Sequence, residues 1–350
     1  MNNRGLLQLR GMKTGAAPGG KLSKEVEVKR FLAMAALMIG ILAAATTVKA
    51  QSPYPSRSIK MICGFPAGSS LDVITRIYAD RLEKTLGQPV VVENRVGASG
   101  NLAAEAVARS APDGYTLLTN GVTLPISMSL FKKISFDVVK DFTPIGFMGN
   151  IPIILAANAG LGLNSVGELT ALAKSRPGEL THGSAGIGSI QHLSGELFNT
   201  MAGVKLAHIP YRGTNQVIVD FLAGRLSLMF APAPTIAPHM KEGNFKMLAV
   251  TSAKRSTLYP DLPTLSESGL PGFDAPLWFA IWAPKDTPQP IVMTIYNVMR
   301  EVPGTPEGRA RPAASGIEAV SMTTDEFAAF VRSEVTKWAK LVETSGATAD

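Results

Sequence analysis

The feature that most constrains this chain is a strand–loop–helix unit that occurs twice along it. The first copy runs from an apolar segment, 59–65, through the loop GFPAGSSLD (64–72) into an amphipathic helix that stops near Gly87. The second copy runs from LTHGSAG (180–186) through the loop SAGIGSIQH (184–192) into another helix. Strands that alternate with amphipathic helices build sheets with right-handed crossovers, so the sequence predicts an α/β fold with parallel strands.

The same alternation continues on both sides of these two units. Further strands are expected at 89–95, 115–121, 151–160, 206–213, 225–231, 245–253 and 277–284, and further helices at 101–111, 166–175, 216–224 and 323–346. We interpret the pattern as a clamp of two lobes, each a sheet flanked by helices. Lobe 1 is expected to comprise residues 51–155 and 272–350, and lobe 2 residues 156–271.

The positive charge of the chain is concentrated at its N-terminus. Eight of the 34 Lys and Arg residues and two of the 27 Asp and Glu residues lie in residues 1–50, which leaves 26 basic and 25 acidic residues in the rest. A nearly neutral body does not favour nucleic acid as a partner. The net charge of +7 therefore describes the leading segment and not a binding surface.

That leading segment has the composition of a signal peptide. Lys29 and Arg30 precede an uncharged apolar run from Phe31 to Val48, and Val48-Lys49-Ala50 resembles a signal peptidase site. The sequence predicts export to the periplasm with cleavage near Ala50. A single membrane anchor is the alternative, because eighteen apolar residues are just long enough to span a bilayer.

Cysteine and histidine usage excludes several kinds of site. Cys63 is the only cysteine, so an intramolecular disulfide and a cysteine-based zinc site are both impossible, and we expect a buried structural thiol. The four histidines (His182, His192, His208 and His239) lack the spacing of metal ligands. We expect neither a metal nor a cofactor.

The two loops are the best candidates for a binding site. Both follow a strand and precede a helix, where ligands bind in parallel α/β sheets, and their Gly and Ser residues leave backbone N–H groups available for an anion. In the alternative interpretation, these residues only cap the helices. His192, in the first turn of the second helix, is expected either to donate to a carboxylate or to be a structural histidine. We expect Asp72 to organise the first loop.

Nucleotide-binding and catalytic motifs fail in detail. Gln191 stands where a dinucleotide-binding fingerprint needs its third glycine, and the first loop lacks the lysine of a phosphate-binding loop. Ser184 lies in HGSAG, where His182 replaces the first glycine of a nucleophile elbow. We therefore do not expect an enzyme. The enzymatic alternative, an exported α/β hydrolase, requires a Ser–His–acid set.

Eight segments between residues 54 and 288 carry a family resemblance, which extends over nearly all of residues 53–350. They are YPSRSIKMICGFPAGSSLDVITR, LGQPVVVENRVGASGN, APDGYTLL, HGSAGIGSIQHLSGELF, HIPYRG, LAVTSAKR, PDLPTLSESGLPGF and WFAIWAPKDTP. In these segments the chain resembles the Bug-type periplasmic substrate-binding proteins of the tripartite tricarboxylate transporter family. The resemblance implies a two-lobed, type II-like Venus-flytrap fold and an exported receptor that holds a small carboxylate between its lobes.

The resemblance also implies ligand contacts and partners. The residues expected at the ligand are Phe65, Ala67, Gly68, Ser69, Ser70, Ser184, Gly186, Gly188, Ser189, His192 and Ala231. We expect the Ser189 hydroxyl to be exposed in its loop. The expected partners are subunits of a membrane transporter or, alternatively, a signalling sensor, and the receptor itself is expected to be a monomer.

Several residues depart from the family pattern. Gly64, Ala67 and Ser69 alter the common form of the first loop, and three prolines (Pro303, Pro306 and Pro312) interrupt a segment that is usually helical. Ala231 stands where the family often has Asp. Without that carboxylate, a ligand ammonium group would be left unpaired. We therefore expect a preference for di- or tricarboxylic or aromatic acids over amino acids.

Overall fold

The computed structural model describes residues 26, 28–35 and 53–349. The main unit begins at Tyr54, and in the separate unit before it residues 28–35 are helical. Beyond residue 35, the apolar run of the expected signal peptide lies outside the described residues. Among the described residues, no helix combines the length and the apolar character needed to cross a membrane.

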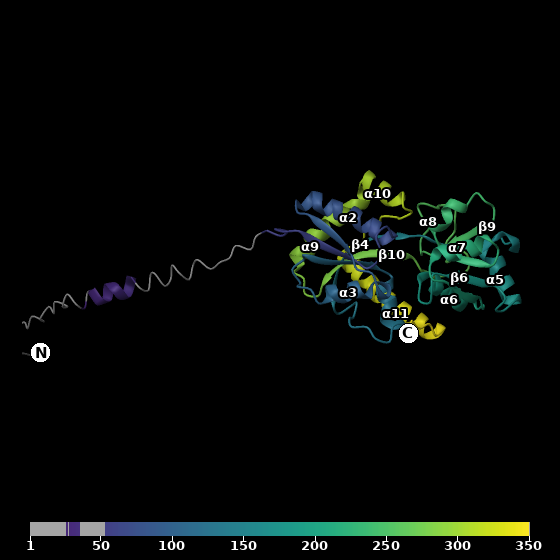
Figure 1. Ribbon diagram of the computed structural model, residues 1–350, viewed down its shortest axis with the longest axis horizontal. Coiled ribbons are helices and arrows are strands. Elements are labelled where there is room, and N and C mark those ends of the chain that lie inside the picture. Colours follow the sequence, from purple (N-terminus) through teal and green to yellow (C-terminus); the bar gives the residue numbers. More distant parts are fainter. Residues whose placement is uncertain (1–25, 27, 36–52, 350) are drawn as a thin grey trace, which may run out of the picture. The chain divides into compact units, whose positions relative to one another are not determined.

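Two five-stranded sheets define the two lobes of the main unit (Figure 1). The first sheet has the strand order β2-β1-β3-β10-β4, and the second has the order β7-β6-β8-β5-β9. The two orders correspond strand for strand, because the chain builds the same arrangement twice. This architecture confirms the predicted α/β fold.

The first lobe contains elements from both ends of the main unit. Its strands are β1 (Ile59–Cys63), β2 (Val90–Asn94), β3 (Thr116–Gly121), β4 (Phe142–Ile151) and β10 (Leu277–Pro284). Its helices are α2 (Ser70–Leu86), α3 (Asn101–Ala108), α4 (Thr123–Leu130), α9 (Gln289–Glu301), α10 (Pro306–Ala313) and α11 (Thr324–Ser345), with short 3-10 turns η2 (Ala98–Gly100) and η5 (Val302–Gly304).

The second lobe is formed by the middle of the chain. Its strands are β5 (Ile153–Asn158), β6 (Thr181–Ser184), β7 (Ala207–Pro210), β8 (Leu228–Pro232) and β9 (Phe245–Val250). Its helices are α5 (Val166–Ser175), α6 (Ile190–Ala202), α7 (Thr214–Leu222) and α8 (Ala233–Ile236), with 3-10 turns η3 (Ala159–Leu161) and η4 (Ala237–His239).

The expectation of parallel strands is correct for all but one strand of each sheet. β10 runs antiparallel to both of its neighbours, β3 and β4, and β5 runs antiparallel to β8 and β9. Each exception is the strand by which the chain enters that lobe from the other one, so it approaches from the opposite end. The first passage lies at Pro152, between β4 and β5, whereas the expected boundary at 155/156 falls inside β5.

Hydrogen bonds to one carboxylate, that of Glu318, connect the two lobes near this passage. Glu318 pairs with Asn150 of β4 through two backbone hydrogen bonds and accepts the Asn150 side-chain amide at 3.0 Å. Its other oxygen accepts hydrogen bonds from the hydroxyls of Ser256 at 2.9 Å and of Thr257 at 2.8 Å. Residues 256–258 follow β9, so Glu318 links the first lobe to a segment of the second.

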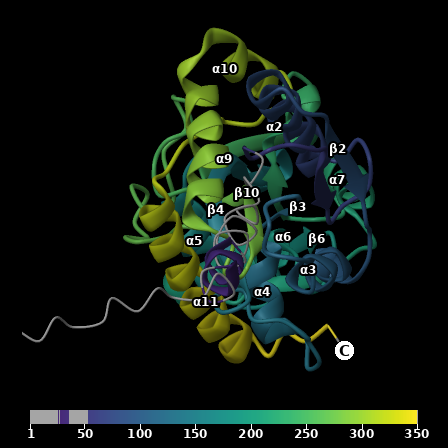
Figure 2. The same cartoon turned by 90° about the vertical axis from the view of Figure 1, so that its left-hand side faces the viewer.

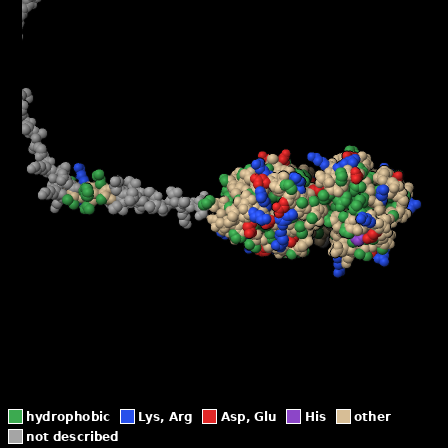
Figure 3. Space-filling view, turned by 90° about the horizontal axis from the view of Figure 1, so that it is seen from above, with side chains coloured by type: hydrophobic (Ala, Val, Ile, Leu, Met, Phe, Trp, Pro, Cys, Tyr) green, Lys and Arg blue, Asp and Glu red, His purple; other side chains and the backbone are tan. Residues whose placement is uncertain are grey.

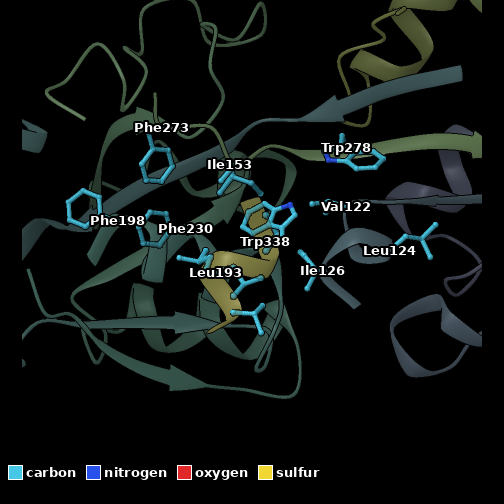
Figure 4. Packing of buried hydrophobic residues seen from close by; sticks show 14 of the residues in the cluster. Val122, Leu124, Ile126, Ile153, Leu193, Phe198, Phe230, Phe273, Trp278 and Trp338 are labelled. Atoms are coloured by element: carbon cyan, nitrogen blue, oxygen red, sulfur yellow. The ribbon is translucent and has the colours of Figure 1, made fainter. Parts of the chain in front are cut away.

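The C-terminal helix α11 completes a core that spans both lobes. It packs against α4, as Figure 2 shows, and against α6. Its Trp338 is fully buried among Ile126 of α4, Ile153 of β5 and Leu193 of α6 (Figure 4). The buried Glu334 accepts the indole N–H groups of Trp278 at 2.8 Å and Trp338 at 3.0 Å, which satisfies both buried donors.

Paired charges cover α2 and α10 on the face shown in Figure 3. Asp80 accepts from Lys84 at 3.1 Å and from Arg311 at 2.8 Å, and Arg81 pairs with Glu301 at 2.9 Å. Such exposed pairs contribute little to stability, but the neighbouring opposite charges cancel much of each other's field.

Candidate ligand-binding site

The two predicted loops are built on the same local plan. Ser69 is the N-cap of α2, where its hydroxyl accepts the N–H of Asp72 at 3.3 Å, and Ser189 is the N-cap of α6, where its hydroxyl accepts the N–H of His192 at 3.3 Å. In both loops the residue before the cap is a glycine with positive φ, +80° at Gly68 and +75° at Gly188. This conformation favours glycine.

A second hydrogen bond fixes each of these glycines. The Gly68 N–H donates to Asp72 Oδ2 at 2.9 Å, and the Gly188 N–H donates to His192 Nδ1 at 3.1 Å. The acceptor belongs to the third residue of the helix in both cases. The sequence pattern is therefore Gly-Ser-x-x-acceptor, and in each loop the cap and the acceptor together hold two backbone N–H groups.

Asp72 is buried beneath the first loop and has several donors. Besides Gly68, it accepts two hydrogen bonds from the Arg76 guanidinium, both at 3.0 Å, and one from Asn94 at 2.8 Å. Burial alone would raise the pKa of Asp72, but the hydrogen bonds from Arg76, Gly68 and Asn94 lower it below its usual range. Asn94 also donates to the carbonyl of Phe65 at 2.9 Å, so this network ties the loop to β2.

Internal hydrogen bonds occupy much of the second loop. The N–H of Ala185 donates to Gln191 Oε1 at 2.9 Å, and that of Gly186 donates to Ser184 Oγ at 3.2 Å. Together with the Gly188 bond, these contacts leave far fewer bare amides than the Gly–Ser composition suggests. The loop geometry is thus held from within.

Among the described N–H groups without an acceptor, four occupy equivalent places at the two helix starts. They belong to the first two residues of each helix, Ser70 and Leu71 in α2 and Ile190 and Gln191 in α6. The first turn of a helix leaves such groups unpaired, and the helix dipole adds partial positive charge there. The two helix starts can therefore bind anionic groups.

The serine hydroxyls of the predicted site have different roles. Those of Ser69 and Ser189 cap helices, and the half-buried Ser189 hydroxyl also donates to the Gly186 carbonyl at 2.7 Å. The expectation of an exposed Ser189 hydroxyl is therefore wrong, because the cap turns it inward. Ser184 is fully buried, with its hydroxyl 2.6 Å from His208 Nε2. Ser70 is half-buried, at the first position of α2.

Three histidines form a stack beneath the second loop. His182 and His208 are directly opposed on β6 and β7, with ring centroids 5.0 Å apart, and His192 of α6 stacks on His208 at 3.9 Å. The sequence spacing did not predict this cluster, because strand pairing and a helix crossing bring the rings together. Among the described residues, no group of His, Cys, Asp and Glu side chains has the arrangement of a metal site.

Burial keeps this stack uncharged. It lowers the pKa of His192 and of His208 to about 4, and in His192 the neighbouring His208 adds to the effect. His182 is fully buried, and neither of its ring nitrogens has a hydrogen-bond partner. Its pKa falls to about 3, through burial first and then through His208 and His192.

The Ser184–His208 pair is the contact most similar to the hydrolase alternative. A nucleophilic serine has to present its oxygen to a substrate at an exposed turn. Here the Ser184 hydroxyl is buried and accepts the Gly186 N–H of its own loop. This geometry makes Ser184 part of the support of the loop.

Two residues highlighted by the sequence lie in the cores of the lobes. Ala231 of β8 is fully buried in an apolar cluster with Ile154, Val217 and Phe221. Its side chain packs in that core with no exposed surface, so the structure gives no support to the argument that based ligand preference on Ala231. Cys63, at the end of β1, is fully buried, as predicted.

The orphaned nitrogens of His182 lead to a prediction about stability. Replacing His182 with Phe keeps a flat ring against Gly195 and Phe230 and removes two buried polar atoms without partners. We expect His182→Phe to raise the free energy of unfolding by about 1–3 kcal/mol at pH 7. In the unfolded chain His182 binds a proton below its ordinary pKa of 6.5, whereas in the folded protein it does so only below a pKa of about 3. Acid between these values therefore destabilises the folded wild type. The gain should therefore widen between pH 6.5 and 3.

Urea denaturation at several pH values measures this gain. The matched control is His239→Phe, at a half-exposed histidine that pairs with Glu242, and its effect at pH 7 should stay within about 0.5 kcal/mol. A His182→Phe protein less stable than the wild type at pH 7 would contradict the prediction.

Comparison with known proteins identifies the family. Residues 74–347 match the model of the tripartite tricarboxylate transporter family receptor. The chain is 37% identical to protein BugT of Bordetella pertussis, over 92% of this chain and 99% of BugT. Among solved structures it resembles R. palustris Rpa4515 with adipate, at 33% identity and a TM-score of 0.71, over 84% of this chain and 99% of that one.

A second Rhodopseudomonas palustris protein, MatC with bound malate, is 29% identical with a TM-score of 0.67 and covers 83% of this chain and all of its own. The periplasmic binding protein BugD is 34% identical with a TM-score of 0.67, over 84% of this chain and 99% of its own. These matches confirm the resemblance found in the sequence. The chain belongs to the receptor family of the tripartite tricarboxylate transporters, the Bug-type periplasmic solute-binding proteins.

Proposed function

We propose that this protein captures a small dicarboxylate between its lobes, at the starts of α2 and α6, and delivers it to a membrane transporter. The observation that carries the proposal is the set of four N–H groups without acceptors at Ser70, Leu71, Ile190 and Gln191. α2 and α6 are 17 and 13 residues long, so each presents a well-developed dipole to the ligand.

Neutral groups hold the ligand in this proposal. The N–H groups of the two helix starts and the Ser70 hydroxyl bind carboxylate oxygens, while Phe65 and Ala67 of the first loop and the exposed Ile187 of the second enclose the carbon chain. Ser69, Ser184, Gly186, Gly188 and Ser189 support the loops from within. The protein binds its ligand without transforming it, without a cofactor, and as a monomer.

The charges near the loops favour a ligand without an ammonium group. The carboxylate of Asp72 is committed to Gly68, Arg76 and Asn94, so the first loop offers no unpaired anion. The second loop is held by neutral imidazole. An ammonium group between the loops would be desolvated without a partner, which is costly. Relatives crystallised with adipate and with malate support a dicarboxylate.

A ligand panel tests this preference. We expect adipate, succinate and malate to stabilise the protein, and aspartate and glutamate to do so less than succinate and glutarate, their matched partners without an amino group. At a concentration of about 100 Kd, a true ligand adds about 2.7 kcal/mol to the free energy of unfolding. Thermal-shift titrations measure this. Larger shifts with the amino acids would refute the charge argument, and no shift with any acid would refute the proposed ligand class.

A variant at the first residue of α2 tests the position of the ligand. In Ser70→Glu a carboxylate replaces the hydroxyl beside the bound anion, and repulsion at about 4 Å should weaken binding by about 1–4 kcal/mol. The empty protein should keep its stability, because an acidic residue suits the start of a helix. Calorimetric titration with the best ligand of the panel measures the loss.

The matched control adds the same charge to another helix start. Gln289 is exposed at the first position of α9, away from both loops, so Gln289→Glu should leave affinity unchanged. If Ser70→Glu binds the ligand as tightly as Gln289→Glu does, the ligand does not lie at the start of α2.

The cellular location is the last element of the proposal. We infer that residues 1–50 act as a signal peptide and that the receptor works in the periplasm. Protein recovered from the periplasm should then begin at or near Gln51, because the peptidase site ends at Ala50. Mass spectrometry of the intact protein measures the N-terminus. A chain that retains Phe31–Val48 in the membrane fraction would support the anchor instead.

A further inference from the structure

The two loops have the same hydrogen-bond arrangement but differ in the charges of two residues. These are the side chain that accepts the glycine N–H and the residue four positions after it. In α2, Asp72 accepts the Gly68 N–H, and four residues later Arg76 pairs with it. In α6, His192 accepts the Gly188 N–H, and four residues later Glu196 Oε1 lies 3.7 Å from His192 Nε2. The acidic and basic positions are exchanged between the lobes. Only the second loop therefore depends on an acceptor whose single lone pair is removed by one proton.

We propose that the neutral imidazole of His192 is the positioning residue of the second loop, and that its protonation releases Gly188 and with it the carboxylate ligand. The inference rests on the proposed function, and it adds to that function a proton-linked control of binding. Nδ1 can accept the Gly188 N–H only while it carries no proton, so the ring proton of the binding state sits on Nε2, on the side of Glu196.

Protonation changes the partners of His192 on both sides. With a proton on Nδ1, two N–H groups face each other and the hydrogen bond to Gly188 is lost. The imidazolium gains attraction to Glu196, whose pKa is raised by burial. Gly188 has the positive φ of a glycine turn and packs on Leu130 of α4, so a shift of this residue changes the direction of the adjoining Ile190 and Gln191 N–H groups.

The surroundings of His192 make the neutral form the resting state. The ring is 6% exposed and stacks on His208, which in turn stacks on His182, so a charge on any ring would be desolvated and would repel a second one. Phe230 faces His182 from β8. α11 also packs on α6, and its buried Glu334 pairs with Lys337. Glu196 is the anion that faces His192 itself.

Two substitutions distinguish the role of His192 as a hydrogen-bond acceptor from its ability to bind a proton. His192→Asn keeps a neutral oxygen that can accept the Gly188 N–H, as Asp72 does in the first loop, but it takes up no proton. His192→Phe keeps a stacked ring and removes the acceptor. We expect His192→Asn to retain affinity for adipate within about threefold at pH 7, and His192→Phe to lose about tenfold or more at every pH.

The decisive measurement compares the wild type with His192→Asn from pH 7 to pH 3.5. Because adipate itself binds protons in this range, the quantity compared is the ratio of the two affinities at each pH. With a pKa of His192 of about 4, coupling to one proton should make the wild type about fourfold weaker relative to His192→Asn at pH 3.5 than at pH 7. The His239→Asn control should follow the wild type.

A second readout works without ligand. In the empty wild type, hydrogen exchange of the Gly188 amide, followed by NMR, should lose protection in acid, while in His192→Asn the protection should persist. The indole N–H signals of Trp278 and Trp338, both bound to Glu334, report that the core stays folded. A flat affinity ratio, or Gly188 protection with the same pH dependence in both proteins, would overturn the proposal. If adipate fails to bind at any pH, the ligand assignment fails, and Gly188 exchange alone decides the role of His192.

Discussion

The hydrogen bond from a loop glycine to the third residue of the following helix is the interaction on which the site depends. It occurs twice, from Gly68 to Asp72 and from Gly188 to His192. In each loop it occupies the N–H group before the cap, while the serine cap occupies the N–H group at the third helical position. Of the three N–H groups between them, that of the cap serine donates to the carbonyl of Pro66 or Gly186, and the two at the helix start stay free. Because these N–H groups are already free in the empty protein, the loop is preorganised to bind an anion.

The connections between the lobes suit a receptor that has to move around such a site. Two antiparallel strands, β5 and β10, carry the chain from one lobe to the other, and Glu318 adds hydrogen bonds beside them. α11 packs its fully buried Trp338 into a core shared by both lobes. A change of the angle between the lobes would have to involve these connections and the shared contacts of α11, because a change inside either sheet would disrupt a close-packed core.

Much of the fold could be predicted from the sequence, because its strands and helices follow hydrophobic periodicity and its turns contain glycine or proline. β4 was missed, since its run of FTPIGFMGNI contains Pro144 and two glycines and lacks the alternation of a half-buried strand. α9 and α10 were missed because prolines break up that segment, yet Pro306 starts α10 at a position where proline is favoured. The reversed strands β5 and β10 follow from chain topology, which no local pattern records.

The candidate site was only partly accessible to sequence reasoning. The two loops were located, since glycine and serine between a strand and a helix are a local signal. The amides that stay free could not be predicted, because this depends on which loop N–H groups the side chains of Gln191, Asp72 and His192 accept. The histidine stack required the pairing of β6 with β7, and the burial of Ala231 required knowing which face of β8 meets α7. The repeated Gly-Ser-x-x-acceptor pattern was visible in the sequence and was the signal that could have revealed His192 as a partner of Gly188.

The central claim is that the first two N–H groups of α2 and of α6 hold the carboxylates. Amide NMR of the protein titrated with adipate tests it most directly. The account predicts that the Ser70, Leu71, Ile190 and Gln191 amides shift downfield and gain protection from exchange, while the Gly68 and Gly188 amides, already bonded internally, change little. Saturable binding that leaves those four amides unchanged and perturbs others would contradict it.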